Sequence, residues 1–126
     1  MVRTLKLSGS LPEAMEQLNK LPEDLREVTR RILFNIMEYA SNMAKIYCPV
    51  DTGTLRNSIR IEETTVGNTV GFRLVAGGRD YINPKTGRPC DYARMVEAKI
   101  PFMAPALYAV APLVKQAIYE AVEASL

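Results

Sequence analysis

Histidine is absent from this sequence of 126 residues, and cysteine occurs only twice. Histidine is the commonest general base of enzymes and a frequent zinc ligand, so two cysteines without it make a poor zinc site. The sequence also lacks a Gly-rich phosphate loop of the P-loop or dinucleotide-binding type. We therefore expect no catalytic residue, no cofactor and no metal site.

An excess of charge of one sign is missing as well. The 16 Lys and Arg residues nearly balance the 14 Asp and Glu residues, which leaves a net charge of +2. A dedicated nucleic-acid binder needs a clustered basic surplus for its phosphate contacts, whereas the basic residues here are spread along the chain. We expect no sequence-specific binding of nucleic acid.

Carboxylates remain as candidate catalytic groups, and those considered are Asp51, Glu62, Glu63, Asp80, Asp91 and Glu97. Paired carboxylates hydrolyse glycosidic bonds in glycosidases, but no spacing distinguishes a pair among these residues. Because acids are rarely buried, we expect them to be solvated. Two alternative functions stay open: a small carboxylate-dependent hydrolase, which needs two acids converging in a pocket, and a DNA-binding accessory protein, which needs a basic stripe.

Long hydrophobic runs are missing too, so the sequence predicts neither a signal peptide at Met1–Lys6 nor a membrane partner. Cys48 and Cys90 do not make a disulfide framework, and we expect free thiols in a protein kept in a cytoplasm. The composition, 48% hydrophobic and 24% charged, is typical of a globular protein. We expect one domain over residues 1–126.

The first residues predict two short elements. Arg3–Leu7 alternates polar and apolar residues, as a short strand does. Ser10 followed three residues later by Glu13 forms a capping box, and Pro12 is tolerated in a first helical turn. We expect a short helix from there to about residue 19 or 20.

The strongest periodic signal predicts a long helix that starts near Pro22 and ends at Cys48, because the residue before Pro49 avoids helical angles. Apolar residues recur at three- and four-residue steps, which is typical of one buried stripe. The members of this stripe are Leu25, Val28, Ile32, Leu33, Ile36, Ala40, Met43 and Tyr47, with Arg26, Arg30 and Glu38 on the opposite side.

Two strands, Ser58–Val66 and Thr69–Ala76, are predicted around a two-residue turn at Gly67-Asn68. That turn sets a register in which Ile61 faces Leu74, Ile59 faces Ala76 and Glu62 faces Arg73. Val70 and Phe72 then share the apolar face with these residues, and the polar pair lies on the other face.

The rest of the chain predicts a loop and two helices. Gly77–Asp91 is rich in Gly and Pro and predicts a long loop, and a loop of this length inside a compact domain is usually functional or disordered. Asp91–Ala98 predicts a short helix that carries Tyr92, Met95 and Val96. Pro101–Leu126 predicts the last helix, with a kink or restart at Pro112. Its apolar stripe comprises Ala106, Leu107, Val110, Leu113, Val114, Ala117, Ile118 and Val122.

The fold class that follows is α+β: a small antiparallel sheet of about three or four strands, packed against the long helix and the C-terminal helix. The segment Pro49–Ile59 connects helix to hairpin. Asp51 and Thr52 can cap the next turn, Gly53 permits a sharp backbone, and Leu55 and Ile59 point inward.

The same segment resembles part of a known family. Its string Pro-Val-Asp-Thr-Gly, then Leu55-Arg56 and Ser58-Ile59, is similar to minor virion proteins of long-tailed double-stranded DNA bacteriophages. These are tail-component, head–tail joining or tail-completion proteins. A second string resembles the family in the same order and spacing, through Tyr92-Ala93, Val96-Glu97, Pro101-Phe102 and Pro105-Ala106-Leu107. The resemblance covers most of the chain from the long helix onward.

The resemblance implies a non-enzymatic ring subunit in the phage neck or at the head-proximal end of the tail. Its partners would be copies of itself and neighbouring connector or tail proteins, with DNA only passing through the channel. It would reside in the host cytoplasm during assembly and then in the virion. Candidate interface and motif residues are Asp51, Thr52, Gly53, Leu55, Arg56, Arg79, Lys85, Arg88, Tyr92, Glu97 and Phe102.

Overall fold

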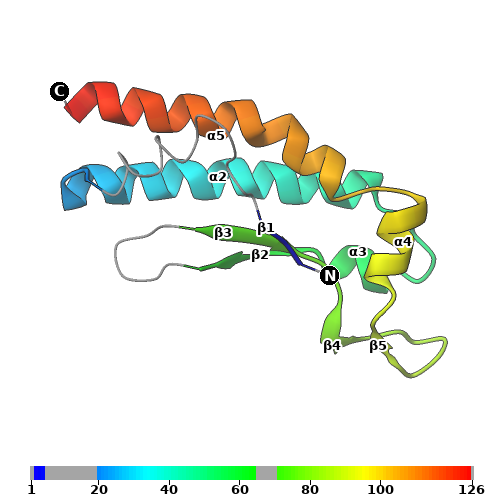
Figure 1. The fold of residues 1–126 in the computed structure, drawn as a ribbon. Helices are drawn as coiled ribbons and strands as arrows, with labels where there is room; N and C mark the ends of the chain where they lie inside the picture. The colour runs from blue at the N-terminus through cyan, green and yellow to red at the C-terminus, as the bar shows by residue number, and fades with distance from the viewer. Residues whose placement is uncertain (1, 5–19, 65–70, 126) are drawn as a thin grey trace.

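The computed structural model describes residues 2–4, 20–64 and 71–125, and these residues form three layers. The two long helices α2 (Glu23–Tyr47) and α5 (Ala104–Ser125) run side by side (Figure 1). Helix α2 lies between α5 and a small antiparallel sheet of strand order β1-β3-β2, whose strands span Val2–Thr4, Phe72–Val75 and Arg60–Glu63 in that order. A second sheet, formed by β4 (Gly78–Ile82) and β5 (Pro89–Cys90), extends from the end of the molecule that lies away from the C-terminus (Figure 1). The predicted α+β class is confirmed.

Helix α2 spans Glu23–Tyr47, which confirms the predicted long helix. Glu23 and Asp24 lie in its first turn and Lys45 in its last, where their charges complement the helix dipole. The helix ends at Cys48, whose φ of −68° and ψ of 127° are extended. This ending follows from Pro49, which disfavours helical angles in the residue before it.

The buried face of α2 differs from the predicted apolar stripe. It consists of Thr29, Leu33, Met37, Ala40, Ser41 and Ala44. Val28, Ile32 and Tyr47, which were predicted to be buried, are 53%, 42% and 42% exposed. The prediction was wrong for these residues because α2 carries apolar side chains on two faces, and periodicity alone does not show which face the rest of the chain covers.

The three-stranded sheet has the predicted hairpin register. β2 (Arg60–Glu63) pairs with β3 (Phe72–Val75) so that Ile61 faces Leu74 and Glu62 faces Arg73. β1 (Val2–Thr4), which overlaps the predicted strand Arg3–Leu7, pairs with the other edge of β3. The turn at 67–68, the rest of the first strand and the helix predicted from residue 10 lie outside the described residues.

The segment predicted as a loop forms a two-stranded antiparallel ribbon, so that prediction was wrong. β4 (Gly78–Ile82) pairs with β5 (Pro89–Cys90). The turn between them is closed by backbone hydrogen bonds from the Asn83 N–H to the Arg88 carbonyl (2.9 Å) and from the Gly87 N–H to the Asn83 carbonyl (2.8 Å). The abundant Gly and Pro concealed this ribbon, because its strands are short and carry few apolar residues.

Helix α4 spans Ala93–Lys99, close to its predicted range, and α5 spans Ala104–Ser125. α5 continues through Pro112, so no restart occurs there, and its axis bends in the orange first half seen in Figure 1. Leu113 is 45% exposed, which corrects its predicted place in the stripe. The other stripe residues are buried or half-buried.

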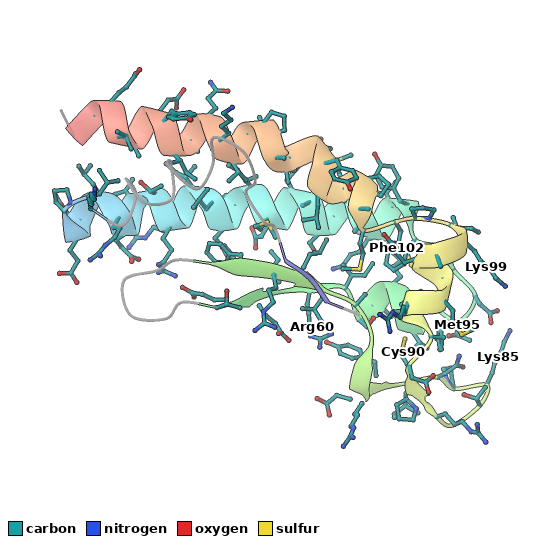
Figure 2. The ribbon with its side chains drawn as sticks, viewed as in Figure 1. Arg60, Lys85, Cys90, Met95, Lys99 and Phe102 are labelled. Atoms are coloured by element: carbon teal, nitrogen blue, oxygen red, sulfur yellow. The ribbon has the colours of Figure 1, made fainter. Side chains whose placement is uncertain are left out.

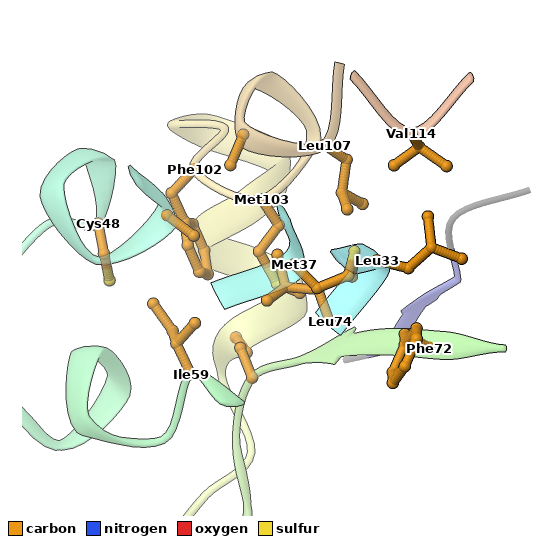
Figure 3. Close-up of a cluster of buried hydrophobic side chains, with 14 of the residues drawn as sticks. Leu33, Met37, Cys48, Ile59, Phe72, Leu74, Phe102, Met103, Leu107 and Val114 are labelled. Atoms are coloured by element: carbon orange, nitrogen blue, oxygen red, sulfur yellow. The ribbon is translucent and has the colours of Figure 1, made fainter. Parts of the chain in front are cut away.

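One hydrophobic core joins these elements. Phe102 and Met103, in the segment between α4 and α5, are fully buried and point toward Met37 of α2 and Leu74 of β3 (Figure 3). Ile59 closes the same cluster from the sheet side. The segment before α5 is therefore fixed by the core, and with it the position of the ribbon and of α4.

Candidate functional site

The connector Pro49–Ile59 contains a short helix, α3 (Thr54–Asn57), preceded by Gly53 at a φ of 85°. This left-handed backbone is readily adopted only by glycine. Leu55 and Ile59 are buried, as predicted. The Thr52 and Thr54 hydroxyls lie 2.7 Å apart, and the Thr54 N–H reaches the Thr52 hydroxyl at 3.3 Å. Thr52 therefore assists the turn in the way that its sequence position predicts.

Asp51 has a different role from the predicted cap. Its carboxylate accepts a hydrogen bond from the Lys85 Nζ at 2.7 Å, which links the connector to the tip of the β4–β5 ribbon. The side chains are 73% and 64% exposed, so water weakens the ion pair. The two segments are far apart in sequence, and this contact brings two of the predicted site residues together.

Ser58 and Arg60 anchor the ribbon to the connector, and neither role was predicted from the sequence. The Ser58 hydroxyl is fully buried, donates to the Leu55 carbonyl and accepts from the Gly77 N–H at 2.7 Å. The Arg60 guanidinium donates to the Ser58 and Gly77 carbonyls, each at 2.8 Å, and lies over the Tyr81 ring. Ser58 lies in the string Pro49–Ile59, which resembles the phage family. That resemblance was the signal in the sequence that could have pointed to its role.

Glu97 fixes the backbone of the second string, which runs from Tyr92 to Leu107. This side chain is 5% exposed, and its carboxylate accepts backbone N–H groups from Phe102 (2.8 Å), Met103 (3.0 Å) and Ala104 (3.0 Å). It thereby satisfies donors at the N-terminal end of α5 that have no partner within the helix. The spacing between the Val96-Glu97 and Pro101-Phe102 pairs lets the Glu97 carboxylate reach these backbone N–H groups.

Asn83 and Tyr92 join the ribbon to α4. The Asn83 amide donates to the Tyr92 phenol oxygen at 3.2 Å, and its side-chain oxygen accepts the Lys85 N–H at 2.9 Å. Burial raises the pKa of the Tyr92 phenol, and a hydrogen bond with Cys90 raises it further. The phenol is therefore neutral at physiological pH and serves as a fixed hydrogen-bonding group.

Most of the predicted site residues thus fall into two groups, while Thr52, Gly53 and Tyr92 are half-buried. Leu55, Glu97 and Phe102 are buried and hold the backbone in place, so they do not reach a partner directly. Exposed side chains gather on the ribbon, α3 and α4, a region that we call the ribbon end. Its exposed cations are Arg56, Arg79, Lys85, Arg88, Arg94 and Lys99, and its exposed acids are Asp51, Asp80 and Asp91. Figure 2 shows Lys85, Met95 and Lys99 pointing away from the body of the molecule.

Groups with potential reactivity are held in unreactive settings. Cys48 and Cys90 are free, as predicted, and both are buried. Burial raises the pKa of the Cys48 thiol, as does the nearby Cys90. The oxygens of Glu97 are occupied by backbone N–H groups. Within residues 2–4, 20–64 and 71–125, no group of three His, Cys, Asp or Glu side chains is placed to hold a metal ion.

No helix in the described part of the chain is both long and apolar enough to cross a membrane. Among known proteins, a family model described as "Bacteriophage HK97-gp10, putative tail-component" matches residues 13–98, more than half of the chain. The matched range includes the connector, the ribbon and Glu97, and it ends before Phe102. No curated protein and no solved structure matches the chain.

Proposed function

The chain belongs to the HK97-gp10-like family of bacteriophage tail components, and we propose that it is a structural, non-enzymatic virion subunit that forms a ring in the neck or at the head-proximal end of the tail. The match over residues 13–98 is the observation that carries this proposal. Partners of the ring are copies of the chain and neighbouring connector or tail proteins. DNA passes through the channel without sequence readout.

The ribbon end supports the proposal because contacts within the chain hold it in place. Glu97 fixes the start of α5, while Ser58 and Arg60 hold the ribbon against the connector. A closed ring needs a heterologous contact, in which one patch meets a different patch of the next copy. We propose that the exposed cations Arg79, Lys85 and Arg88 belong to one such patch.

The hydrolase alternative receives no support from the described residues. Asp51, Asp80 and Asp91 are exposed, and Glu97 is engaged by the backbone. The DNA-binding alternative would require a basic stripe, but acids are interspersed among the cations of the ribbon end. We therefore propose no second function.

Deleting the gene from the phage that encodes this chain tests the proposal. We expect DNA-filled heads and separate tails that do not join, with infectivity restored by the wild-type gene. Electron microscopy of complemented particles should place the tagged chain as a ring between head and tail. Particles of normal shape and infectivity without the chain would contradict the proposal.

A pair of charge reversals tests the patch itself. The double variant Arg79→Glu/Arg88→Glu should be excluded from particles at unchanged thermal stability, because both side chains are exposed. The control, Lys115→Glu on the exposed side of α5, should be incorporated like the wild type. Equal incorporation of all three proteins would remove the ribbon end from the interface.

A further inference from the structure

Helix α2 carries a second apolar face in addition to the one that its own core uses. Val28, Ile32, Tyr39 and Ile46 are 53%, 42%, 54% and 78% exposed. Four large apolar side chains exposed along one helix are unusual unless a partner covers them. We call these residues, with the exposed Asn35 and Asn42 between them, the α2 outer face.

The spacing of the α2 outer face is that of a coiled coil. Positions 28, 32, 35, 39, 42 and 46 alternate steps of four and three residues, which is the a/d repeat of two packed helices. At 3.6 residues per turn, these positions lie within an arc of about 80° and extend for roughly 27 Å. The outer face therefore has the shape that accepts another helix.

The other sides of α2 are occupied within its own chain. The ring centroids of Phe34 and of Phe72 in β3 lie 5.9 Å apart, and the Arg30 guanidinium donates a hydrogen bond of 2.9 Å to the Glu63 carboxylate in β2. Phe34 and Arg30 therefore mark the side of α2 that faces the sheet. Leu33 belongs to the core that includes α5. The outer face lies on the remaining side, where its side chains are exposed to solvent.

We propose that the half of the α2 outer face from Val28 to Tyr39 packs against the same half in a second copy of this chain, with the two helices antiparallel. The flanking charges favour this occupant and orientation. Arg31 and Glu38 are exposed, carry opposite charges and lie seven residues apart on one flank of the face, and Arg31 also lies 3.6 Å from Glu27 of its own helix. When Val28 of one copy meets Tyr39 of the other, each Arg31 lies beside the second copy's Glu38.

A parallel arrangement lacks this complementarity. It would place Arg31 and Glu38 beside Ile36 and Met43 of the second copy, which carry no charge. In the antiparallel register, Asn35 meets Ile32 of the second copy, which lowers the affinity but disfavours other registers, as single polar residues in coiled-coil seams do. We therefore expect a dimer with two-fold symmetry that has low affinity and one defined register.

This inference goes beyond the proposed function, because the dimer forms from the free protein without other virion parts. It uses a surface distinct from the ribbon end, so loss of the dimer would not affect the ring proposal. Sedimentation of the purified chain from about 1 to about 500 μM should show a monomer–dimer equilibrium, as expected for one helical contact. A monomer at all concentrations would overturn the inference.

Substitutions on α2 and on α5 test which helix face forms the dimer. Ile32→Lys/Tyr39→Lys should abolish the dimer, while Leu113→Lys, which changes an exposed apolar residue on α5, should leave it unchanged. Far-UV circular dichroism checks that each variant is folded. If the α5 variant dissociates the dimer as strongly as the α2 variant, the face is wrongly assigned.

A charge exchange tests the orientation. Arg31→Glu and Glu38→Arg should each weaken the dimer by about tenfold, because each creates two like-charge contacts across the pair. The double variant Arg31→Glu/Glu38→Arg should restore the wild-type affinity. A double variant that is no tighter than either single variant would overturn the antiparallel arrangement.

Discussion

Glu97 is buried at the end of α4, and its carboxylate binds the N-terminal end of α5 through three backbone N–H groups. Charged hydrogen bonds of this kind are stronger than neutral ones, because the low dielectric of the interior does not screen them. One side chain therefore sets the angle at which α5 leaves the segment containing Phe102. The position of the ribbon end depends on that angle.

Replacement of Glu97 tests this role. We expect Glu97→Ala to lower the free energy of unfolding by about 3 kcal/mol or more, since it leaves buried N–H donors without an acceptor. Glu97→Gln keeps an acceptor oxygen and should cost less. Urea denaturation of the two variants and the wild type measures the difference. An alanine variant as stable as the wild type would show that water replaces the carboxylate.

Cys48 gives a prediction for pH. Burial raises the pKa of its thiol above the ordinary 9.0, so the folded protein retains a proton that the unfolded chain releases. This contribution to stability is fully present below pH 9 and is lost as the pH rises through the folded-state pKa. We expect wild type to lose more stability than Cys48→Ser between pH 8 and about pH 10.5, measured by thermal unfolding. Parallel curves for the two proteins would contradict this expectation.

Three glycines with positive φ, Gly77, Gly78 and Gly87, lie in or next to the β4–β5 ribbon, and Gly77 and Gly87 differ most in their surroundings. Gly77 has a φ of +84°, and a Cβ there would lie 2.8 Å from the Cys90 carbonyl oxygen. Gly87 has a φ of +70° and open space around it. Gly77 permits close packing between the ribbon strands, whereas Gly87 serves only the turn.

A pair of alanine variants separates these effects. Gly87→Ala should cost about 1 kcal/mol, the usual penalty of a left-handed backbone for an L-residue. Gly77→Ala should cost at least twice as much, because the Cys90 backbone must also move away. Denaturant titrations give both values. Equal losses would mean that the ribbon yields to the added methyl group without strain.

The molecule as a whole is organised around one core. Buried residues from α2, α3, β3, β5, α4 and α5 belong to a single cluster, so no element carries a separate core in the described part of the chain. Phe102 and Leu74 lie within this cluster, one between the helices α4 and α5 and one on the sheet (Figure 3). Such an arrangement favours cooperative unfolding of the domain predicted over residues 1–126.

Calorimetry tests this cooperativity. We expect one thermal transition, with the calorimetric enthalpy equal to the van't Hoff enthalpy. Fluorescence of the tyrosines and far-UV circular dichroism should give the same midpoint. A separate, earlier transition that involves only the ribbon end would show that this region folds independently of the helices.

The long helix, the hairpin register, the short helix α4 and the free cysteines were all predictable from local sequence. Proline boundaries and the two-residue alternation of strands act between near neighbours, so they can be read along the chain. The connector was also predictable in outline, because Gly53 and the inward-facing Leu55 follow local rules.

The ribbon, the Asp51–Lys85 ion pair and the Glu97 cap depend on contacts between segments that the core brings together. Val28 and Ile32 illustrate the physical reason. Their spacing marks them as members of an apolar face, but burial depends on which side of α2 the sheet and α5 occupy. Apolar residues on two faces satisfy the same periodicity equally well, and only packing distinguishes the face that forms the core from the face left for a partner.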